Sequence, residues 1–179
     1  KEMDIVSYGL VSLDNAKSFL SVTDSSKNEV LKYLINQSTD YLEKRCNRRF
    51  LSTIYSNEEY DGSGISELNL KQFPVITFTK LEINNAVDNS DDWEEIDSSD
   101  YWVDLDSGLI TKTSDFEGGK NRYRATYTAG YATIPYDLQF ACLILVSEIL
   151  NMRSAGGIKS ESLGDHSITM ESILQNNEV

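Results

Sequence analysis

The sequence predicts an α+β fold: a helical core of two long helices plus a short N-terminal helix, an inserted small antiparallel β-sheet and an extended C-terminal arm. Three observations support this prediction. Apolar residues recur at helical spacing over residues 27–49 and again over 135–154. Between them, over 51–131, β-branched and aromatic residues alternate with polar ones, and turn residues separate the runs. After Gly157 the chain becomes polar.

Length and charge limit the classes of protein to consider. With 179 residues, of which 40% are hydrophobic, the chain can bury one sizeable core. We therefore predict a single domain over 1–157, followed by an arm over 158–179. The net charge of −13 argues against a protein that grips nucleic acid broadly, because such binding needs Lys and Arg. Solubility explains this charge, and an acidic wall would also let DNA slide past.

The first helix is expected over 12–22 and the second over 27–49. Ser12 precedes an amphipathic run and is a suitable N-cap. Ser26 and Glu29 fit a capping box at the start of the second helix. That helix has an apolar face, and its last turns are basic, with Lys44, Arg45, Arg48 and Arg49.

The inserted region is expected to hold six strands. Turn residues at 61–62, 106–108 and 118–119 separate them, and residues 105–110 are expected to form a tight hairpin. The predicted strands are Thr53–Glu59, Glu67–Leu70, Ile76–Asn84, Tyr101–Asp104, Leu109–Thr113 and Asn121–Thr128.

The third helix, over 135–154, is apolar nearly all round. Pro135 opens it at a position where the missing N–H costs nothing, and Gly156 and Gly157 follow its end. A helix of this kind is buried, either in the subunit's core or between subunits. We expect it to pack against the helix over 27–49.

The C-terminal arm has one patterned stretch. Three residues alternate with polar neighbours there, which predicts a short strand with no obvious partner nearby: His166, Ile168 and Met170. Such a strand suits addition to a partner's sheet, with Gly156 and Gly157 separating it from the helix. A terminus without fixed structure is the alternative.

No pattern for catalysis, a cofactor or a metal is found. Cys46 and Cys142 are expected to be buried free thiols, and His166 is the only histidine. The acidic stretch Asp88–Asp106 offers carboxylates to Ca²⁺, but it departs from the EF-hand loop, so a solvated loop and hairpin is the simpler interpretation. Gly62-Ser63-Gly64 lacks the lysine of a phosphate-binding loop and is expected to be a surface turn.

The basic residues Lys44, Arg45, Arg48 and Arg49 allow two interpretations. Cations at the end of a helix complement its dipole. Alternatively, they contact acidic surfaces of a neighbouring subunit or the phosphates of DNA.

Four stretches, in this order, resemble the head–tail connector (adaptor, or head-completion) family of tailed bacteriophages. They span most of the chain, although each is short, and the acidic residues 88–100 have no counterpart that we can match. The stretches are the helix pair 13–20 and 24–50, ending Arg45-Cys46-Asn47-Arg48-Arg49-Phe50; the strand entry Tyr60-Asp61-Gly62-Ser63-Gly64 with Leu68-Asn69-Leu70 and Phe73-Pro74-Val75; the strand-to-helix junction 125–131 with Ile134-Pro135 and Asp137-Leu138; and 160–168 near the end.

The resemblance implies a structural protein without enzymatic activity. Such proteins form a closed ring, usually of twelve copies, that binds below the portal, extends the DNA channel and docks the next neck or tail protein. The implied location is the virion's head–tail junction, after assembly in the host cytoplasm, where DNA passes without tight binding and no membrane is involved. The implied portal or subunit interface lies in the arm, at Ser160, Ser162, Leu163, Gly164, Asp165, His166, Ile168 and Met170.

Two alternatives remain open at this point, besides an enzyme for which no catalytic pattern is found. One is another phage neck or tail-completion protein. The other is a carbohydrate-binding β module, which Trp93, Trp102 and the many tyrosines would suit. Two long helices and the absence of a secretion signal argue against the module.

Overall fold

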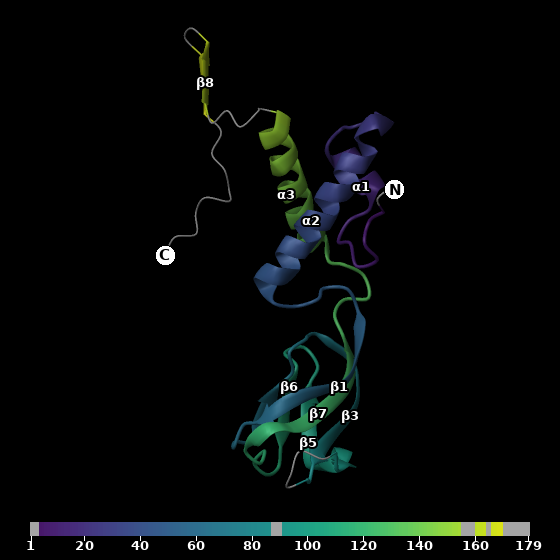
Figure 1. The fold of residues 1–179 in the computed structure, drawn as a ribbon, viewed down its shortest axis with the longest axis vertical. Coiled ribbons are helices and arrows are strands. Elements are labelled where there is room, and N and C mark those ends of the chain that lie inside the picture. The colour runs from purple at the N-terminus through teal and green to yellow at the C-terminus, as the bar shows by residue number, and fades with distance from the viewer. Residues whose placement is uncertain (1–3, 87–90, 155–159, 164–165, 170–179) are drawn as a thin grey trace. The chain divides into compact units, whose positions relative to one another are not determined.

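The computed structural model describes residues 4–86, 91–154, 160–163 and 166–169. The chain divides into two compact units, one made of Lys1–Arg45 with Tyr136–Val179 and the other of Cys46–Pro135. We call them the α unit and the β unit. The β unit is thus inserted between two helices of the α unit, as the sequence predicts (Figure 1). That residues 1–157 act as one domain stays a prediction.

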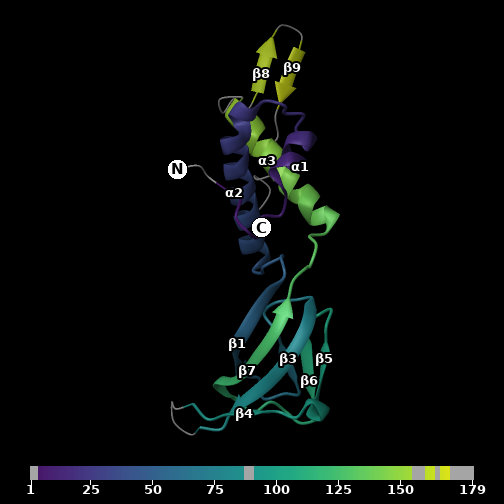
Figure 2. The ribbon, with the colours of Figure 1, turned by 90° about the vertical axis from the view of Figure 1, so that its right-hand side faces the viewer.

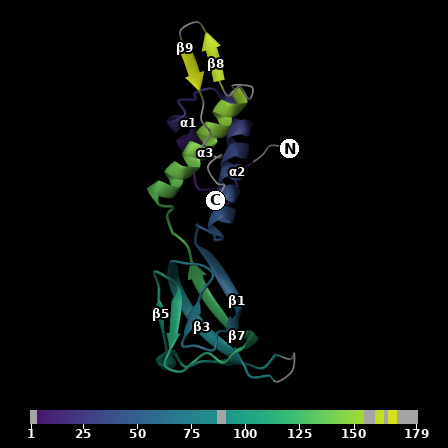
Figure 3. The same cartoon turned by 90° about the vertical axis from the view of Figure 1, so that its left-hand side faces the viewer.

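The α unit contains α1 (Leu13–Phe19), the 3-10 turn η1 (Ser25–Lys27), α2 (Asn28–Cys46) and α3 (Tyr136–Ser154). The three α-helices lie side by side in all three ribbon views (Figures 1, 2 and 3). The predicted cap of α1 is confirmed, because the Ser12 side chain accepts a hydrogen bond from the Asn15 N–H. The helix ends earlier than expected, since Ser21 has a left-handed φ of 54°.

Both ends of α2 differ from the prediction over 27–49. At its start, Asp24 caps η1, and the Asp24 carboxylate accepts hydrogen bonds from the Ser26 N–H and hydroxyl. The capping box of Ser26 and Glu29 stays a prediction. At the other end, α2 stops at Cys46 because Asn47 has a φ of 50°, outside the helical region. Arg48 and Arg49 therefore lie beyond the helix, in the β unit.

The core of the α unit is built from a few positions on each helix. Leu31, Leu34 and Ile35 of α2 are buried, as is Val146 of α3. The predicted packing of α2 against α3 is confirmed at Thr39, whose hydroxyl is hydrogen-bonded to the buried Cys142 sulfur. The same hydroxyl accepts the Leu10 N–H at 3.2 Å, which ties the N-terminal segment to both helices.

We expect Ser38→Ala to stabilise the α unit by about 1–2 kcal/mol, as measured by urea unfolding followed by helical circular dichroism. The Ser38 hydroxyl oxygen is buried and has no hydrogen-bond partner among the described residues. An unsatisfied buried hydroxyl costs free energy, and alanine also favours the helix.

The neighbouring Thr39→Val is the matched control. It should destabilise the unit by a similar amount, about 1–2 kcal/mol, because it removes the acceptor of Leu10 and the partner of Cys142. Equal losses in both variants would show that Ser38 is hydrogen-bonded in solution.

The β unit contains two antiparallel sheets, where the sequence predicts one. A four-stranded sheet has the order β1-β7-β3-β4, and a three-stranded sheet has the order β2-β6-β5. All six predicted strands are present, Tyr101–Asp104 with the predicted bounds and the other five with shifted ends, and β4 is an additional strand that the acidic stretch concealed. The strands are β1 (Thr53–Gly62), β2 (Glu67–Asn69), β3 (Val75–Asn84), β4 (Trp93–Glu95), β5 (Tyr101–Asp104), β6 (Leu109–Lys112) and β7 (Gly119–Ala129), with the 3-10 turn η2 (Ser98–Asp100) before β5.

The inner faces of the two sheets enclose one apolar core. The central strand β7 alternates strictly, with Tyr123, Ala125, Tyr127 and Ala129 buried. Leu68 of β2 and Ile110 of β6 face them from the other sheet. Figure 2 shows β7 between β1 and β3, as the strand order requires. The expected hairpin over 105–110 is confirmed, joining β5 to β6.

The β unit is closed where the chain enters and leaves it. Leu51 and Tyr131 form a bridge, the Ser52 N–H donates to the Tyr131 carbonyl at 3.0 Å, and the Tyr131 N–H donates to the Phe50 carbonyl at 2.7 Å. Gly130 lies beside this closure with a φ of 109°, a conformation that favours glycine.

The C-terminal segment contains a two-stranded hairpin. β8 (Ser160–Leu163) pairs antiparallel with β9 (His166–Thr169), so Ser162 lies opposite Ser167. The sequence predicts a strand around His166 with no obvious partner nearby. The structure differs from this prediction, because β8 pairs with that strand. The role of this segment as an interaction arm stays a prediction. Among the described helices, none has the length and apolarity needed to cross a membrane.

Candidate assembly surfaces

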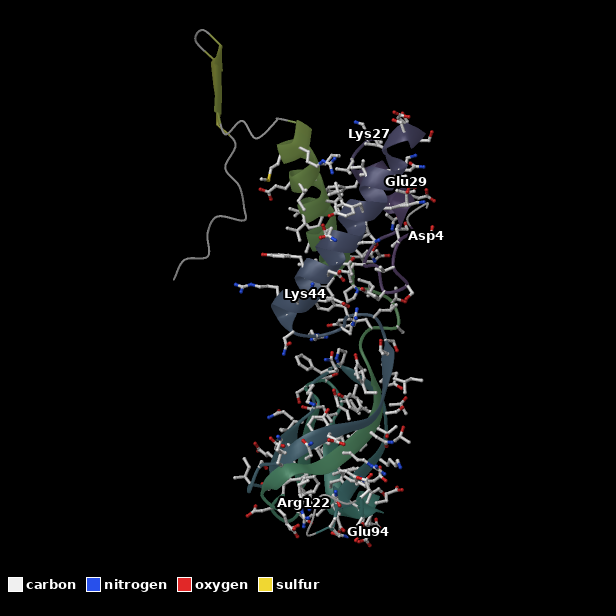
Figure 4. All side chains as sticks on the ribbon, in the orientation of Figure 1. Asp4, Lys27, Glu29, Lys44, Glu94 and Arg122 are labelled. Atoms are coloured by element: carbon white, nitrogen blue, oxygen red, sulfur yellow. The ribbon has the colours of Figure 1, made fainter. Side chains whose placement is uncertain are left out.

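The basic residues near the end of α2 are divided between the two units. Lys44 and Arg45 belong to the α unit, whereas Arg48 and Arg49 belong to the β unit. Lys44 is exposed and its side chain points away from α2 (Figure 4). Arg45 and Arg49 are exposed as well, and the Arg49 N–H donates to the Gln72 side-chain oxygen at 2.9 Å. Contact of these residues with DNA or a neighbouring subunit stays a prediction.

Arg48 has a structural role that the sequence did not indicate. Its guanidinium carbon lies 4.2 Å from the centre of the Phe73 ring, and the rings of Phe50 and Tyr131 are at 5.4 and 5.7 Å. These distances are typical of cation–π contacts. Nε and one terminal nitrogen of Arg48 are buried without a hydrogen-bond partner in the described residues. Arg48 therefore holds the entry of the β unit together.

The predicted interface residues of the tail are only partly described. Ser160, Ser162 and Leu163 lie in β8, and His166 and Ile168 lie in β9, so one hairpin brings these five together. Gly164, Asp165 and Met170 lie outside the described residues. Their participation in an interface stays a prediction.

The two cysteines differ from each other. Cys142 is buried, as predicted, and burial raises the pKa of its thiol to about 11. The prediction for Cys46 is wrong, because this thiol is exposed at the end of α2. The helix stops there, so the apolar face that the sequence suggested does not continue past it.

The acidic residues of the β unit serve its turns. Asp97 caps η2 by accepting the Ser99 N–H, and Asp104 closes the hairpin by accepting the Asp106 N–H and the Ser107 hydroxyl. These hydrogen bonds lower the pKa of both carboxyls. Among the described residues, no three or more His, Cys, Asp or Glu side chains lie together as a metal site would need.

The buried Glu82 of β3 forms an ion pair across the four-stranded sheet. Arg124 of β7 donates to its two carboxylate oxygens at 2.9 and 2.8 Å, and the Lys80 ammonium lies 3.0 Å away. Arg124 also stacks on Trp93 of β4, at 4.3 Å from the ring centre. Hydrogen bonds from Arg124, opposed by burial, lower the pKa of Glu82 from its ordinary value of 4.5.

We therefore expect Glu82→Gln to cost about 1–2 kcal/mol at pH 7, less than the loss of a fully buried pair because both cations stay partly hydrated. A carboxyl with a lowered folded-state pKa stabilises above its unfolded pKa, and this contribution disappears as the pH falls through the folded value. The difference from the wild type should thus shrink below about pH 4.5. Urea unfolding at pH 7 and pH 3.5 measures it, with the exposed Glu95→Gln as control. A difference that is constant with pH would contradict the ion pair.

Two buried tyrosines share one carboxylate within the β unit. The Tyr60 and Tyr127 hydroxyl oxygens lie 3.0 Å apart, and both hydrogen-bond to the Glu58 carboxylate, Tyr127 at 2.5 Å. Burial and the neighbouring carboxylate raise the pKa of both tyrosines well above 10. This group could not be recognised from the sequence pattern, because a β-bulge between Tyr55 and Glu58 shifts the alternation of β1. The group stabilises the core of the β unit.

The surface of α3 is the feature best suited to assembly. Among the side chains of this apolar helix that the structure describes, only those of Cys142 and Val146 are fully buried. Phe140 is 54% exposed, although it contacts Phe19 of α1 edge to face, with the ring centres 6.1 Å apart. Tyr136 is 89% exposed. The remaining apolar side chains are half-buried or exposed, among them Leu138, Leu143, Ile144, Leu145, Ile149, Leu150 and Met152.

Comparisons with known proteins are consistent with a structural role. A family model described as "head completion protein" matches residues 9–157. The neck of an empty gene transfer agent (GTA) particle, computed with C6 symmetry, contains a chain of the same fold, with a TM-score of 0.55 and 15% identity over 86% of this chain and 84% of that one.

Two further solved structures agree. A chain in the virion of a native gene transfer agent gives a TM-score of 0.53 at 15% identity, covering 86% of this chain and 84% of that one. A chain in the neck of a native particle, computed with C12 symmetry, gives 0.52 at 17% identity, covering 86% and 83%. No curated protein matches the sequence.

Proposed function

Because the chain belongs to the head completion protein family, we propose that it is the subunit of a ring that binds below the phage portal, extends the DNA channel and docks the next neck or tail protein. Membership of this family makes the chain a structural protein of the bacteriophage head–tail junction. The ring, its partners and the lack of enzymatic activity are the proposed part.

The observation that carries the ring is the exposed apolar surface of α3. A soluble subunit rarely leaves large apolar side chains such as Phe140 and Tyr136 in water without a partner. A second copy of the chain is the partner that a ring supplies, because each subunit then covers the exposed helix of its neighbour. The C6 and C12 symmetries of the similar necks support a ring of twelve.

The charge of the chain supports a channel that DNA crosses without being held. The net charge is −13. Like charges facing the phosphates keep duplex binding weak at physiological salt.

The segment Ser160–Thr169 is proposed to contact the portal or an adjacent subunit, where repetition around the ring multiplies a weak contact.

Complementation of a phage that lacks this gene tests the ring. Heads that receive the wild-type protein should show a ring below the portal by electron microscopy. Tyr136→Asp and Phe140→Asp should abolish it, whereas Ile54→Asp, on the equally exposed surface of β1, should not. Tyr136 is so exposed that its replacement leaves the subunit folded. Normal rings with both α3 variants would refute α3 as the ring contact.

Truncation after Gly157 tests the tail separately. The truncated subunit should fold but fail to join heads. Normal occupancy of the portals by this variant would show that the helical and β units alone make the joint.

The other candidate functions have less support. A carbohydrate-binding module would present a platform of aromatic rings, but Trp93 is covered by Arg124. A different position in the neck, such as tail completion, would be distinguished by the same micrographs.

A further inference from the structure

The β unit covers most of its aromatic rings with its own cations. Such contacts are favourable within about 6 Å of a ring centre. Four cations of this unit make them: Arg48 over Phe73 at 4.2 Å, Arg124 over Trp93 at 4.3 Å, Lys71 over Tyr60 at 4.7 Å and Lys112 over Phe116 at 5.2 Å.

Trp102 of β5 is exposed and has no such cover, whereas Phe78, Tyr101 and Tyr127 pack against other rings. It is 64% exposed, and no hydrogen bond or ring contact of its side chain is found among the described residues. Trp93, by contrast, donates its indole N–H to Asp91 at 3.0 Å as well as lying under Arg124. Because Tyr101 and Val103 pack against the core, the alternation of β5 places Trp102 on the outer face of the three-stranded sheet.

The surroundings of Trp102 are acidic. Trp102 lies opposite Thr111, which lies opposite Glu67, so these three form one row across the sheet. Asp104 lies two residues along β5, on the same face, and its hydrogen bonds with Ser107 and the Asp106 N–H lower the pKa of its carboxyl. It is therefore ionised at neutral pH.

The sheet's own cation does not reach this face. Lys112 belongs to β6, but its ammonium lies over the rings of Phe116 and Tyr123, which are buried on the core side. The outer face thus combines an uncovered indole with carboxylates and no cation from β2, β5 or β6.

We propose that this face, defined by Trp102, Thr111, Glu67 and Asp104, docks a segment of a partner protein that presents an arginine or lysine. The partner's cation would lie over the Trp102 ring, as the chain's own cations lie over several of its other rings, and the carboxylates would complement the charge of that cation. Phosphates of DNA are disfavoured by the same carboxylates. The inference rests on the proposed function, in which the partner is the next protein of the neck, and it names the chemistry of that contact.

Nuclear magnetic resonance of the full chain tests the chemistry. The protein has two tryptophans, so two indole N–H signals are expected, and Trp102→Phe assigns them. The capped peptide Gly-Arg-Gly-Arg-Gly should move the Trp102 signal but not that of Trp93, and Gly-Glu-Gly-Glu-Gly should move neither. Glu67→Gln should weaken the Arg peptide about two- to fivefold, the size expected for an exposed charge pair.

Other responses overturn the proposal. A Trp102 signal that moves with maltohexaose but not with the Arg peptide would assign the face to glycans. A Trp102 signal that moves with protein concentration alone would assign it to a second copy of the chain. If the Trp102 signal does not respond to the Arg peptide at millimolar concentration, this face does not bind a cation as proposed.

Complementation tests the contact in the particle. Heads with Trp102→Ala should carry the ring but lack the next neck protein, while Ile54→Ala, at 70% exposure on another sheet, should assemble normally. Rings that still recruit that protein at wild-type occupancy would overturn the inference. Loss of the ring itself in Trp102→Ala would make the face a contact between copies. Absence of a ring with the wild-type protein would refute the proposed function instead.

Discussion

Tyr127→Ala should destabilise the β unit by about 4 kcal/mol or more, a large part of the stability of an ordinary domain. The side chain is fully buried, its ring stacks on Tyr55 with the centres 5.2 Å apart, and its hydroxyl bonds the Glu58 carboxylate. Removing it leaves a cavity and a half-buried carboxylate with one donor fewer. Urea unfolding followed by tryptophan fluorescence measures the loss, because both tryptophans lie in the β unit.

Tyr127→Phe separates the hydroxyl from the ring and should cost only about 1–3 kcal/mol. The pH dependence gives a second test. A tyrosine whose folded-state pKa is raised stabilises fully below its unfolded pKa of 10, and this contribution is lost as the pH rises above that value. Wild-type stability should therefore fall above pH 10 more steeply than that of Tyr127→Phe. Parallel curves would mean that the hydroxyl is hydrated.

Gly130→Ala should cost about 2–4 kcal/mol, from an unfavourable φ and from contact with backbone atoms. Gly130 has a φ of 109°, and an added Cβ would lie 2.8 Å from the Phe50 carbonyl oxygen and 2.9 Å from that of Leu51. The closure of the β unit at Tyr131 would have to open to make room.

Gly118→Ala is the matched control for this variant. An added Cβ at Gly118 meets nothing within 4 Å, so the substitution should be neutral or stabilise slightly. The same fluorescence measurement compares the two. Equal effects at both positions would show that the segment around Gly130 adapts freely.

The sequence predicted the elements of the fold better than their grouping. Helical spacing and the Ser12 cap are local patterns, so α1 and the bodies of α2 and α3 could be recognised. The division into two sheets depends on which strands pair, and β1 pairs with β7 across nearly the whole insertion. No local pattern encodes that pairing. β4 was missed because Glu94 and Glu95 are unusual strand residues that pair at an exposed sheet edge.

The candidate surfaces were predicted unevenly for a similar reason. The apolar residues of α3 are visible in the sequence. The helix has more of them than the core of the α unit buries, so some stay exposed. Arg48 was predicted to share an interface role with its basic neighbours. The charge pattern of the sequence does not show that aromatic rings from residues 50, 73 and 131 surround its guanidinium. Trp102 is distinctive because it is exposed while several other rings lie under cations, and the sequence does not show which rings are covered.

The closure of the β unit at Leu51 and Tyr131 has a consequence for the order in which the chain folds. During synthesis α2 emerges long before its partner α3, because the β unit of about 90 residues separates them. All strands of that unit precede α3, so it can close first. Once Ser52 and Tyr131 are joined, only about ten residues link the two helices, and the entropy lost on bringing them together falls by roughly 2 kcal/mol. The inserted unit thereby serves as a short tether for the helices that flank it.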